Sequence, residues 1–122
     1  MQNAITSVEG NPRAAKLVLS LASTHEEVRE VQRLRYKVFI ETAGLSALIS
    51  EDGLDRDEFD TYCDHLIVRD SDTLKVVGTY RVLSAVRGAK IGRVYAENEF
   101  DLGRLEHLRE RMVEAGRACI HP

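Results

Sequence analysis

Residues 65–85 read HLIVRDSDTLKVVGTYRVLSA, and this stretch decides the fold that we predict. Two runs rich in apolar and β-branched residues, His65–Arg69 and Lys75–Ala85, flank the polar turn Asp70–Thr73. Runs of strand length on either side of a polar turn are typical of a β-hairpin. Alternation along the second run puts Arg81 on a face shared with apolar neighbours. Gly78 indicates a bulge or a close approach of another backbone segment.

The segments on either side of this hairpin supply the other predicted elements. Lys16–Ala22 is an apolar run of strand length. Thr24 and Glu27 form a capping box that opens a helix, which we expect to run to about Thr42 and to end before Gly44. The remaining expected elements are a long loop at 45–64 with one helical turn at Leu45–Ile49, a turn at Arg87–Lys90, a short extended segment at Val94–Phe100, a helix at Leu102–Arg111 and a strand at Met112–Ile120.

The order β-α-β-β-α-β predicts an α+β fold, with a mixed, mostly antiparallel sheet and two helices. Residues 1–15 are expected to be a flexible leader, and residues 16–122 a partial domain. Only His121 and Pro122 follow the last predicted strand. Its outer edge would be left as a template for pairing, so we expect a domain that is truncated at its C-terminus.

Composition excludes several classes of protein. The 122 residues carry a net charge of −3, which argues against nucleic acid as the main partner. No apolar run approaches the ~20 residues that cross a bilayer, and the polar N-terminus lacks the apolar core of a signal peptide. We therefore expect a cytoplasmic protein, with peripheral membrane association left open. The four histidines and two cysteines show neither a disulfide framework nor a metal-ligand spacing, so no metal is expected.

The first helix carries an arginine in an unusual place. On a helical wheel, Arg35 falls within the apolar arc that includes Phe39. A guanidinium directed into a core needs carboxylates or a bound anion, and the acidic loop that follows offers such partners. Either a buried scaffold pair or a substrate-facing role explains Arg35, and the sequence leaves both open. On the opposite face lie Arg29, Arg33 and Lys37, which form either a solvated surface or a docking site for an acidic carrier protein.

The last strand holds two further charged residues of interest. Glu114 and Arg117 would face opposite ways in a regular strand, but a bulge at Gly116 would bring them to one side. Two inward arginines beside a chain of acidic residues suit a polar cleft for an amino-acid-like ligand. Cys63 and His65 combine the types of a nucleophile and a base, but residues this close on a strand do not favour a catalytic dyad.

Six segments together resemble one family. They are QRLRYKVF at 32–39, DRDEFD at 55–60, CDHL at 63–66, VGTYRVL at 77–83, YAENEFD at 95–101 and GRACIHP at 116–122. This series, spread over roughly residues 17–122, resembles the N-terminal half of bacterial ornithine N-acyltransferases, often labelled hemolysin-like. These enzymes are related in fold to acyl-homoserine-lactone synthases and to GNAT acyltransferases.

The resemblance implies N-acyl transfer. A 3-hydroxyacyl group would move from acyl carrier protein to the α-amine of ornithine, the first step towards an ornithine lipid. The donor would be an acyl-phosphopantetheine thioester, whose arm lies beside the splayed fourth strand in this fold, and no bound cofactor is implied. Matching positions implied to bind substrate are Arg35, Phe39, Asp57, Asp60, Arg81 and Arg117. The implied candidates for orienting or deprotonating the amine are Glu114 and, second, Glu99.

Relatives of this family continue past the His-Pro pair with a basic segment, a phosphate-binding loop and further strands. We therefore expect this chain alone to lack the donor pocket and to be inactive. Two other functions stay open. One is a signal synthase acting on S-adenosylmethionine, although the Trp common after the first helix in such enzymes is absent here. The other is a non-catalytic module that binds carrier protein or pairs with a second copy through its last strand.

Overall fold

The computed structural model describes residues 6–8, 16–44 and 50–122. The strands form one antiparallel meander in the order β1-β2-β3-β4-β5. The strands are β1 (Thr6–Val8), β2 (Leu17–Leu21), β3 (Asp64–Asp70), β4 (Val76–Leu83) and β5 (Glu114–Ile120). The helical elements are α1 (His25–Tyr36), the π-helical turn η1 (Lys37–Thr42), α2 (Ala85–Ile91) and the 3-10 segments η3 (Tyr95–Asn98) and η4 (Gly103–Arg111). The predicted α+β class and antiparallel sheet are confirmed.

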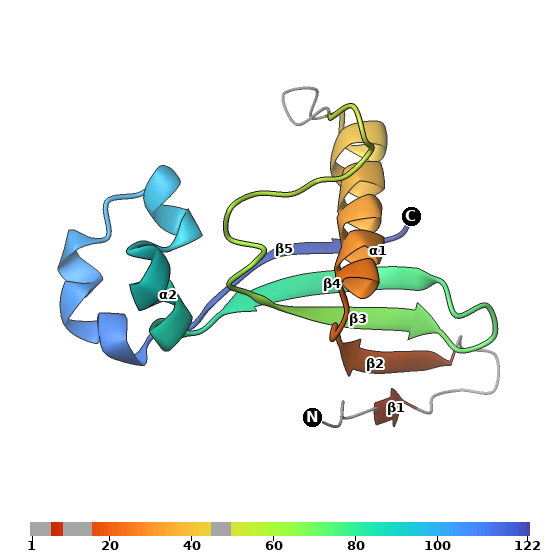
Figure 1. Cartoon of the computed structure of the whole chain (residues 1–122), viewed down its shortest axis with the longest axis horizontal. Coiled ribbons are helices and arrows are strands. Elements are labelled where there is room, and N and C mark those ends of the chain that lie inside the picture. The colour runs from red at the N-terminus through yellow and green to blue at the C-terminus, as the bar shows by residue number, and fades with distance from the viewer. Residues whose placement is uncertain (1–5, 9–15, 45–49) are drawn as a thin grey trace.

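Helix α1 lies across one face of the sheet and crosses the strands (Figure 1). The Thr24 hydroxyl accepts a hydrogen bond from the Glu27 amide at 3.1 Å, so the predicted capping box is present. Gly44, with a φ of 69°, follows the helical turns as expected. Val31 and Leu34 of α1 are buried, and the helix packs mainly against β4. The long helix is therefore anchored over the predicted hairpin.

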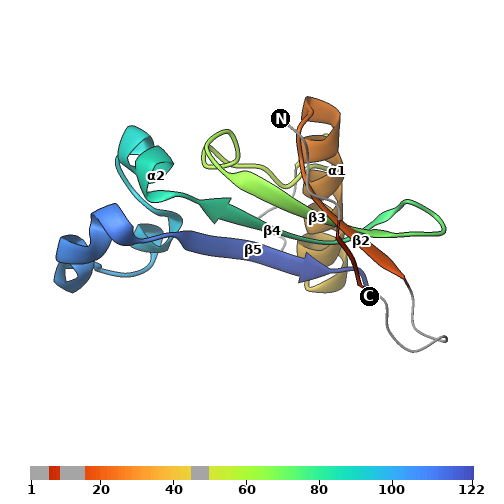
Figure 2. The ribbon, with the colours of Figure 1, turned by 90° about the horizontal axis from the view of Figure 1, so that it is seen from below.

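The segment between β4 and β5 differs from the prediction. Helix α2 replaces the turn expected at Arg87–Lys90, because Ser84 caps its start and Gly92, at a φ of 84°, ends it. Val94–Phe100 was expected to be extended but contains the 3-10 segment η3, and the helix expected at Leu102–Arg111 is the 3-10 segment η4. Figure 2 shows α2 and these two segments gathered at one end of the sheet, where β4 ends and β5 begins.

Two further predictions concern residues 1–15 and the loop that begins at residue 45. Within the expected leader, Thr6–Val8 forms β1 and pairs with β2, which corrects that prediction for these three residues. The helical turn expected at Leu45–Ile49 lies outside the described residues. Among the residues that are described, no helix has the length and apolarity needed to cross a membrane.

Candidate functional site

Arg35 on α1 is the centre of a buried ionic network. Its side chain is 1% exposed. Its Nε donates to Asp55 Oδ2 at 2.9 Å, and its Nη1 and Nη2 donate to the two Asp60 carboxylate oxygens at 2.8 and 2.7 Å. Nη2 also donates to the Asp55 carbonyl oxygen. Since the guanidinium is almost fully buried and each of its nitrogens donates to Asp55 or Asp60, the contacts favour the scaffold role of Arg35 over contact with a substrate.

Arg81 on β4 joins the same network from the sheet. Its side chain is 4% exposed, and its Nη1 donates to Asp57 Oδ1 at 2.6 Å and to Asp60 Oδ1 at 2.7 Å. Burial by itself would raise the pKa of Asp60, but hydrogen bonds and charge from Arg35 and Arg81 outweigh burial and hold this pKa well below its usual value. The prediction that both arginines turn inward onto acidic partners is confirmed. We call Arg35, Arg81, Asp55, Asp57 and Asp60 the ionic scaffold.

Arg117 occupies a bulge in β5. Arg81 pairs with Gly116 and Thr79 with Cys119, so Arg117 and the residue after it oppose a single residue of β4. Arg117 has a φ of 51°, in the left-handed region, where a residue with a side chain is uncommon. The bulge predicted at Gly116 therefore exists. It places the Arg117 side chain beside the same cavity as Glu114.

Aromatic rings alternate with guanidinium groups through the site. In spatial order they are Phe59, Arg81, Tyr95, Arg117 and Phe39, with guanidinium carbon to ring centroid distances of 5.7, 5.2, 5.3 and 5.6 Å. Such cation–π contacts are attractive, most strongly where water is excluded. Phe39, which the resemblance implied as a substrate-binding residue, here supports the Arg117 side chain.

A cavity of about 220 Å³ opens between β4, η3 and the start of β5. The polar and aromatic side chains around it include Arg81, Tyr95, Glu99, Phe100, Glu114 and Arg117. The carboxylate of Glu114 accepts hydrogen bonds from the backbone amides of Tyr95 and Ala96 at 2.7 and 2.8 Å. These bonds fix Glu114 at the start of η3 and also explain why that segment turns instead of extending. Glu99 lies exposed on the same cavity.

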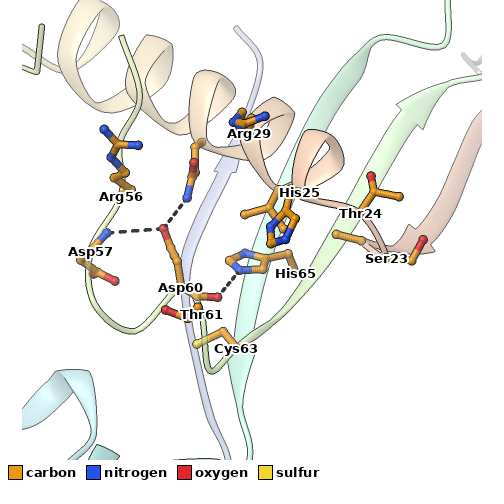
Figure 3. Close-up of a pocket in the computed structure, with 13 residues that line it drawn as sticks. Ser23, Thr24, His25, Arg29, Arg56, Asp57, Asp60, Thr61, Cys63 and His65 are labelled. Atoms are coloured by element: carbon orange, nitrogen blue, oxygen red, sulfur yellow. Dashed lines mark hydrogen bonds between the residues drawn. The ribbon is translucent and has the colours of Figure 1, made fainter. Parts of the chain in front are cut away.

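A second cavity, of about 490 Å³, lies between the start of α1 and the acidic loop (Figure 3). Asp60 lines this cavity, and its carboxylate accepts a hydrogen bond from Gln32 Nε2 at 3.0 Å. His65 Nε2 lies 2.9 Å from the Asp60 carbonyl oxygen. Cys63 borders both cavities, and burial raises the pKa of its thiol to about 11. A thiol with this pKa is a poor nucleophile at neutral pH, in line with the absence of a favoured Cys–His dyad.

The basic residues predicted to dock a carrier protein lie exposed on α1 and at the start of η1. Arg29 and Arg33 both lie near Glu26, at 3.6 and 3.0 Å, so part of their charge is compensated. Lys37 is exposed at the following turn. A role for the three residues in docking stays a prediction. Within the described ranges, no group of three or more His, Cys, Asp or Glu side chains is arranged to hold a metal ion.

Two residues of the site were missed by sequence reasoning. Gln32 bonds to Asp60, and its position three residues before Arg35 on the same helix face was the available signal. Tyr95 stacks on two guanidinium groups, but it reaches them through a 3-10 turn that depends on Glu114, 19 residues later. No local pattern predicts such a contact.

The fold is that of a GNAT-type domain. Residues 34–122 match the acetyltransferase (GNAT) domain family model, and the chain belongs to this family. The solved AHL synthase LasI shares the fold, with a TM-score of 0.59 and 18% identity over 89% of this chain and 55% of that one.

More specific relatives carry the name L-ornithine N(alpha)-acyltransferase. The protein of Rhodobacter capsulatus is 43% identical, covering 85% of this chain and 43% of the relative. Those of Brucella abortus and Rhizobium meliloti are each 34% identical, covering 90% of this chain and 42% and 40% of the relatives. The resemblance seen in the sequence is confirmed. The chain spans about two fifths of the length of these relatives.

Proposed function

We propose that this chain forms the amine-binding portion of an N-acyltransferase that moves a (3-hydroxy)acyl group to the α-amine of ornithine, in ornithine lipid synthesis. The observation that carries this proposal is the cavity beside β5, which Glu114, Glu99 and Arg117 line together with Arg81 of the ionic scaffold. Relatives named for this reaction share 34–43% of their aligned residues with the chain.

In the proposed reaction, the α-ammonium of the acceptor first loses a proton. Glu114 is the proposed base, directly or through one water molecule, because two backbone amides hold its carboxylate at the cavity. The freed amine forms a C–N bond with the acyl carbonyl carbon, and the carbon–sulfur bond of the thioester breaks. The nitrogen then gives up a second proton. The thiolate takes up one of the two protons and the other is released to solvent, so charge and atoms balance.

The ionic scaffold has a positioning role in this proposal. Arg35 and Arg81 hold the acidic loop 55–60 against the sheet, and that loop in turn places Phe59 under Arg81. A reaction centre positioned by a rigid support avoids the reorganisation that a mobile one would need. Removing the scaffold would therefore disturb the cavity even though the scaffold need not touch the substrate.

The proposed donor is an acyl-phosphopantetheine thioester on acyl carrier protein, and the proposed location is the cytoplasm. The proposed docking residues are Arg29, Arg33 and Lys37, and the arm would pass beside the bulged strand β5. Pairing of a second copy along β5 and peripheral membrane association are further proposals. Size-exclusion chromatography and vesicle flotation test these two.

An acyl-transfer assay on a fusion protein tests the proposal. Residues 17–122 replace the matching segment of the Rhodobacter capsulatus relative, and mass spectrometry follows N-acylornithine formed from ornithine and 3-hydroxyacyl carrier protein. We expect product from the fusion, and a loss of at least about 100-fold in kcat with Glu114→Gln, since a general base contributes on that order. Glu110→Gln, at an exposed glutamate outside the cavity, is the control for kcat.

Two results would contradict the proposal. One is an inactive but folded fusion, when the parent relative is active under the same conditions. The other is full activity of the Glu114→Gln fusion, which would remove Glu114 from the chemistry. The unfused chain is assayed in parallel, and we expect negligible product from it.

A further inference from the structure

The cavity between β4, η3 and the start of β5, here called the β5 cavity, is lined by charged groups that differ in how many hydrogen bonds they make within the protein. In the ionic scaffold, Arg35 and Arg81 each donate several hydrogen bonds of 2.6–2.9 Å to carboxylates. Arg117 makes no hydrogen bond within the part of the chain that the structure describes, and its Nε is buried without an acceptor. Its nearest carboxylate oxygens, on Asp55 and Asp57, are 3.5 and 3.8 Å away.

A buried N–H without an acceptor is costly, by about 1–3 kcal/mol. Arg117 is also held in a left-handed backbone conformation, which adds further cost for a residue with a side chain. Stacking between the rings of Tyr95 and Phe39 keeps its guanidinium in a fixed orientation. A planar, preoriented guanidinium with unused donors is suited to receive a carboxylate from outside the protein.

The two glutamate carboxylates of this cavity also differ in their hydrogen bonding. Both oxygens of Glu114 accept backbone hydrogen bonds. The Glu99 side chain has no hydrogen bond or ion pair with the other described residues, although it lines the cavity and lies at its exposed side. The cavity therefore offers one guanidinium with unused donors, on Arg117, and one free carboxylate, on Glu99, in addition to the fixed carboxylate of Glu114.

We infer that this cavity selects an α,ω-diamino acid through two charges: Arg117 binds the α-carboxylate, and Glu99 binds the distal ammonium. This inference rests on the proposed function, and it gives Glu99 a role in specificity instead of proton transfer. The α-amine is then left for Glu114. Tyr95 and Phe100 supply apolar surface for the methylene chain between the two ends. The volume of about 220 Å³ is below the ~300 Å³ at which typical drug-sized sites begin, as a small amino acid requires.

Isothermal titration calorimetry on the full chain tests this inference with three ligands. L-Ornithine has all three groups, L-norvaline has the same carbon skeleton without the distal amine, and 1,4-diaminobutane lacks the carboxylate. For the unaltered chain we expect ornithine to bind about tenfold more tightly than either of the others. We expect ornithine to bind better than its shorter homologue 2,4-diaminobutyrate and its longer homologue lysine, because each of them moves the distal ammonium by one methylene from its place in ornithine.

The variants separate the two contacts. Glu99→Gln should weaken ornithine binding about tenfold and leave norvaline unchanged. Arg117→Gln should weaken both amino acids about tenfold and leave 1,4-diaminobutane unchanged. Glu110→Gln, an exposed glutamate outside the cavity, is the matched control for Glu99, and circular dichroism confirms that each variant is folded. Arg117→Lys keeps the charge but loses the fork of donors, so its affinity should stay below that of the unaltered chain.

Several outcomes would overturn the inference. If Glu99→Gln weakened the binding of ornithine and norvaline equally, Glu99 would not bind the distal ammonium. Equal affinity of the unaltered chain for ornithine and norvaline would also overturn it, while product formation by the fusion protein would still support acyl transfer. If no amino acid binds at millimolar concentration, the two-charge site is wrong, and the fusion assay alone decides the proposed function.

Discussion

The ionic scaffold and the β5 cavity are built from the same residue types but differ in how their charges are satisfied. In the scaffold, each guanidinium hydrogen-bonds to carboxylates of the chain itself, and Asp60 accepts from Arg35, Arg81 and Gln32 together. In the cavity, Arg117 and Glu99 keep unused hydrogen-bonding capacity. Burial of an arginine therefore does not by itself indicate a binding residue. The difference lies in whether the protein already supplies the partners.

The largest expected effect comes from removing the most buried charge. Arg35→Met should reduce the free energy of unfolding by about 3–5 kcal/mol, because Asp55 and Asp60 would lose a buried partner. Urea denaturation followed by circular dichroism measures the loss. If this variant does not fold, Arg35→Lys, which keeps the charge but not the fork of donors, should show a smaller loss in the same experiment.

Arg33→Met is the matched control for this prediction. Its side chain is 53% exposed, and its partner Glu26 is also on the surface. We expect a change of about 0.5 kcal/mol or less. Similar losses for Arg33→Met and Arg35→Met would contradict the view that the scaffold, and not helix α1 in general, carries this stability.

Acid should weaken the ionic scaffold through protonation of Asp60. The folded-state pKa of Asp60 lies below its unfolded value, so its stabilisation is complete above about pH 5 and is lost as pH falls through the folded pKa. We expect the unfolding free energy to fall by about 2–3 kcal/mol between pH 5 and a pH low enough to protonate Asp60 in the folded protein. The difference between the unaltered chain and Asp60→Asn should shrink as pH falls, whereas a constant difference would rule out this linkage.

Sequence reasoning predicted the scaffold better than the cavity, and the reason is periodicity. Helical period places Arg35 on the core side of α1, and strand alternation places Arg81 on the inner face of β4, so both positions follow from local geometry. The two meet because the hairpin and helix stack. The structure confirms both placements.

The cavity depends on contacts between distant segments, which no local pattern encodes. Tyr95 turns inward because the Glu114 carboxylate caps η3, and the sequence suggested an extended strand there instead. Helix α2 was missed because Arg87–Lys90 was expected to be a turn, although Ser84 and Gly92 cap the helix at its two ends. The bulge near Gly116 was predicted, but the missing acceptor of Arg117 becomes visible only in three dimensions.

A smaller effect is expected from Arg117, the arginine of the cavity. Arg117→Gln should lower the unfolding free energy by about 1 kcal/mol, since it loses stacking on Tyr95 and Phe39 but no hydrogen bond. Arg81→Gln, in contact with the same ring of Tyr95, should cost several times more because its carboxylate partners lie within 2.8 Å. Equal costs in urea denaturation would mean that Arg117 belongs to the scaffold after all.

The smallest effect is expected from an ion pair that looks identical to one in the scaffold. Arg87 Nη1 lies 2.7 Å from Asp64 Oδ1, and Arg35 Nη2 lies 2.7 Å from Asp60 Oδ2. The side chains of the first pair are 45% and 49% exposed, whereas those of the second are 1% and 6% exposed. Exposed pairs contribute about 0–1 kcal/mol, because water and salt screen them and either partner can be rehydrated when the other is removed.

Arg87→Gln should therefore change the unfolding free energy by about 0.5 kcal/mol or less, and 1 M NaCl should abolish the change. The cost of Arg35→Met should persist at the same salt concentration, because salt does not penetrate a buried pair. Urea denaturation of both variants at low and high salt measures the contrast. Were the two substitutions to respond equally to salt, the equal distances would matter more than burial, and the distinction between a saturated scaffold and an open cavity would lose its physical basis.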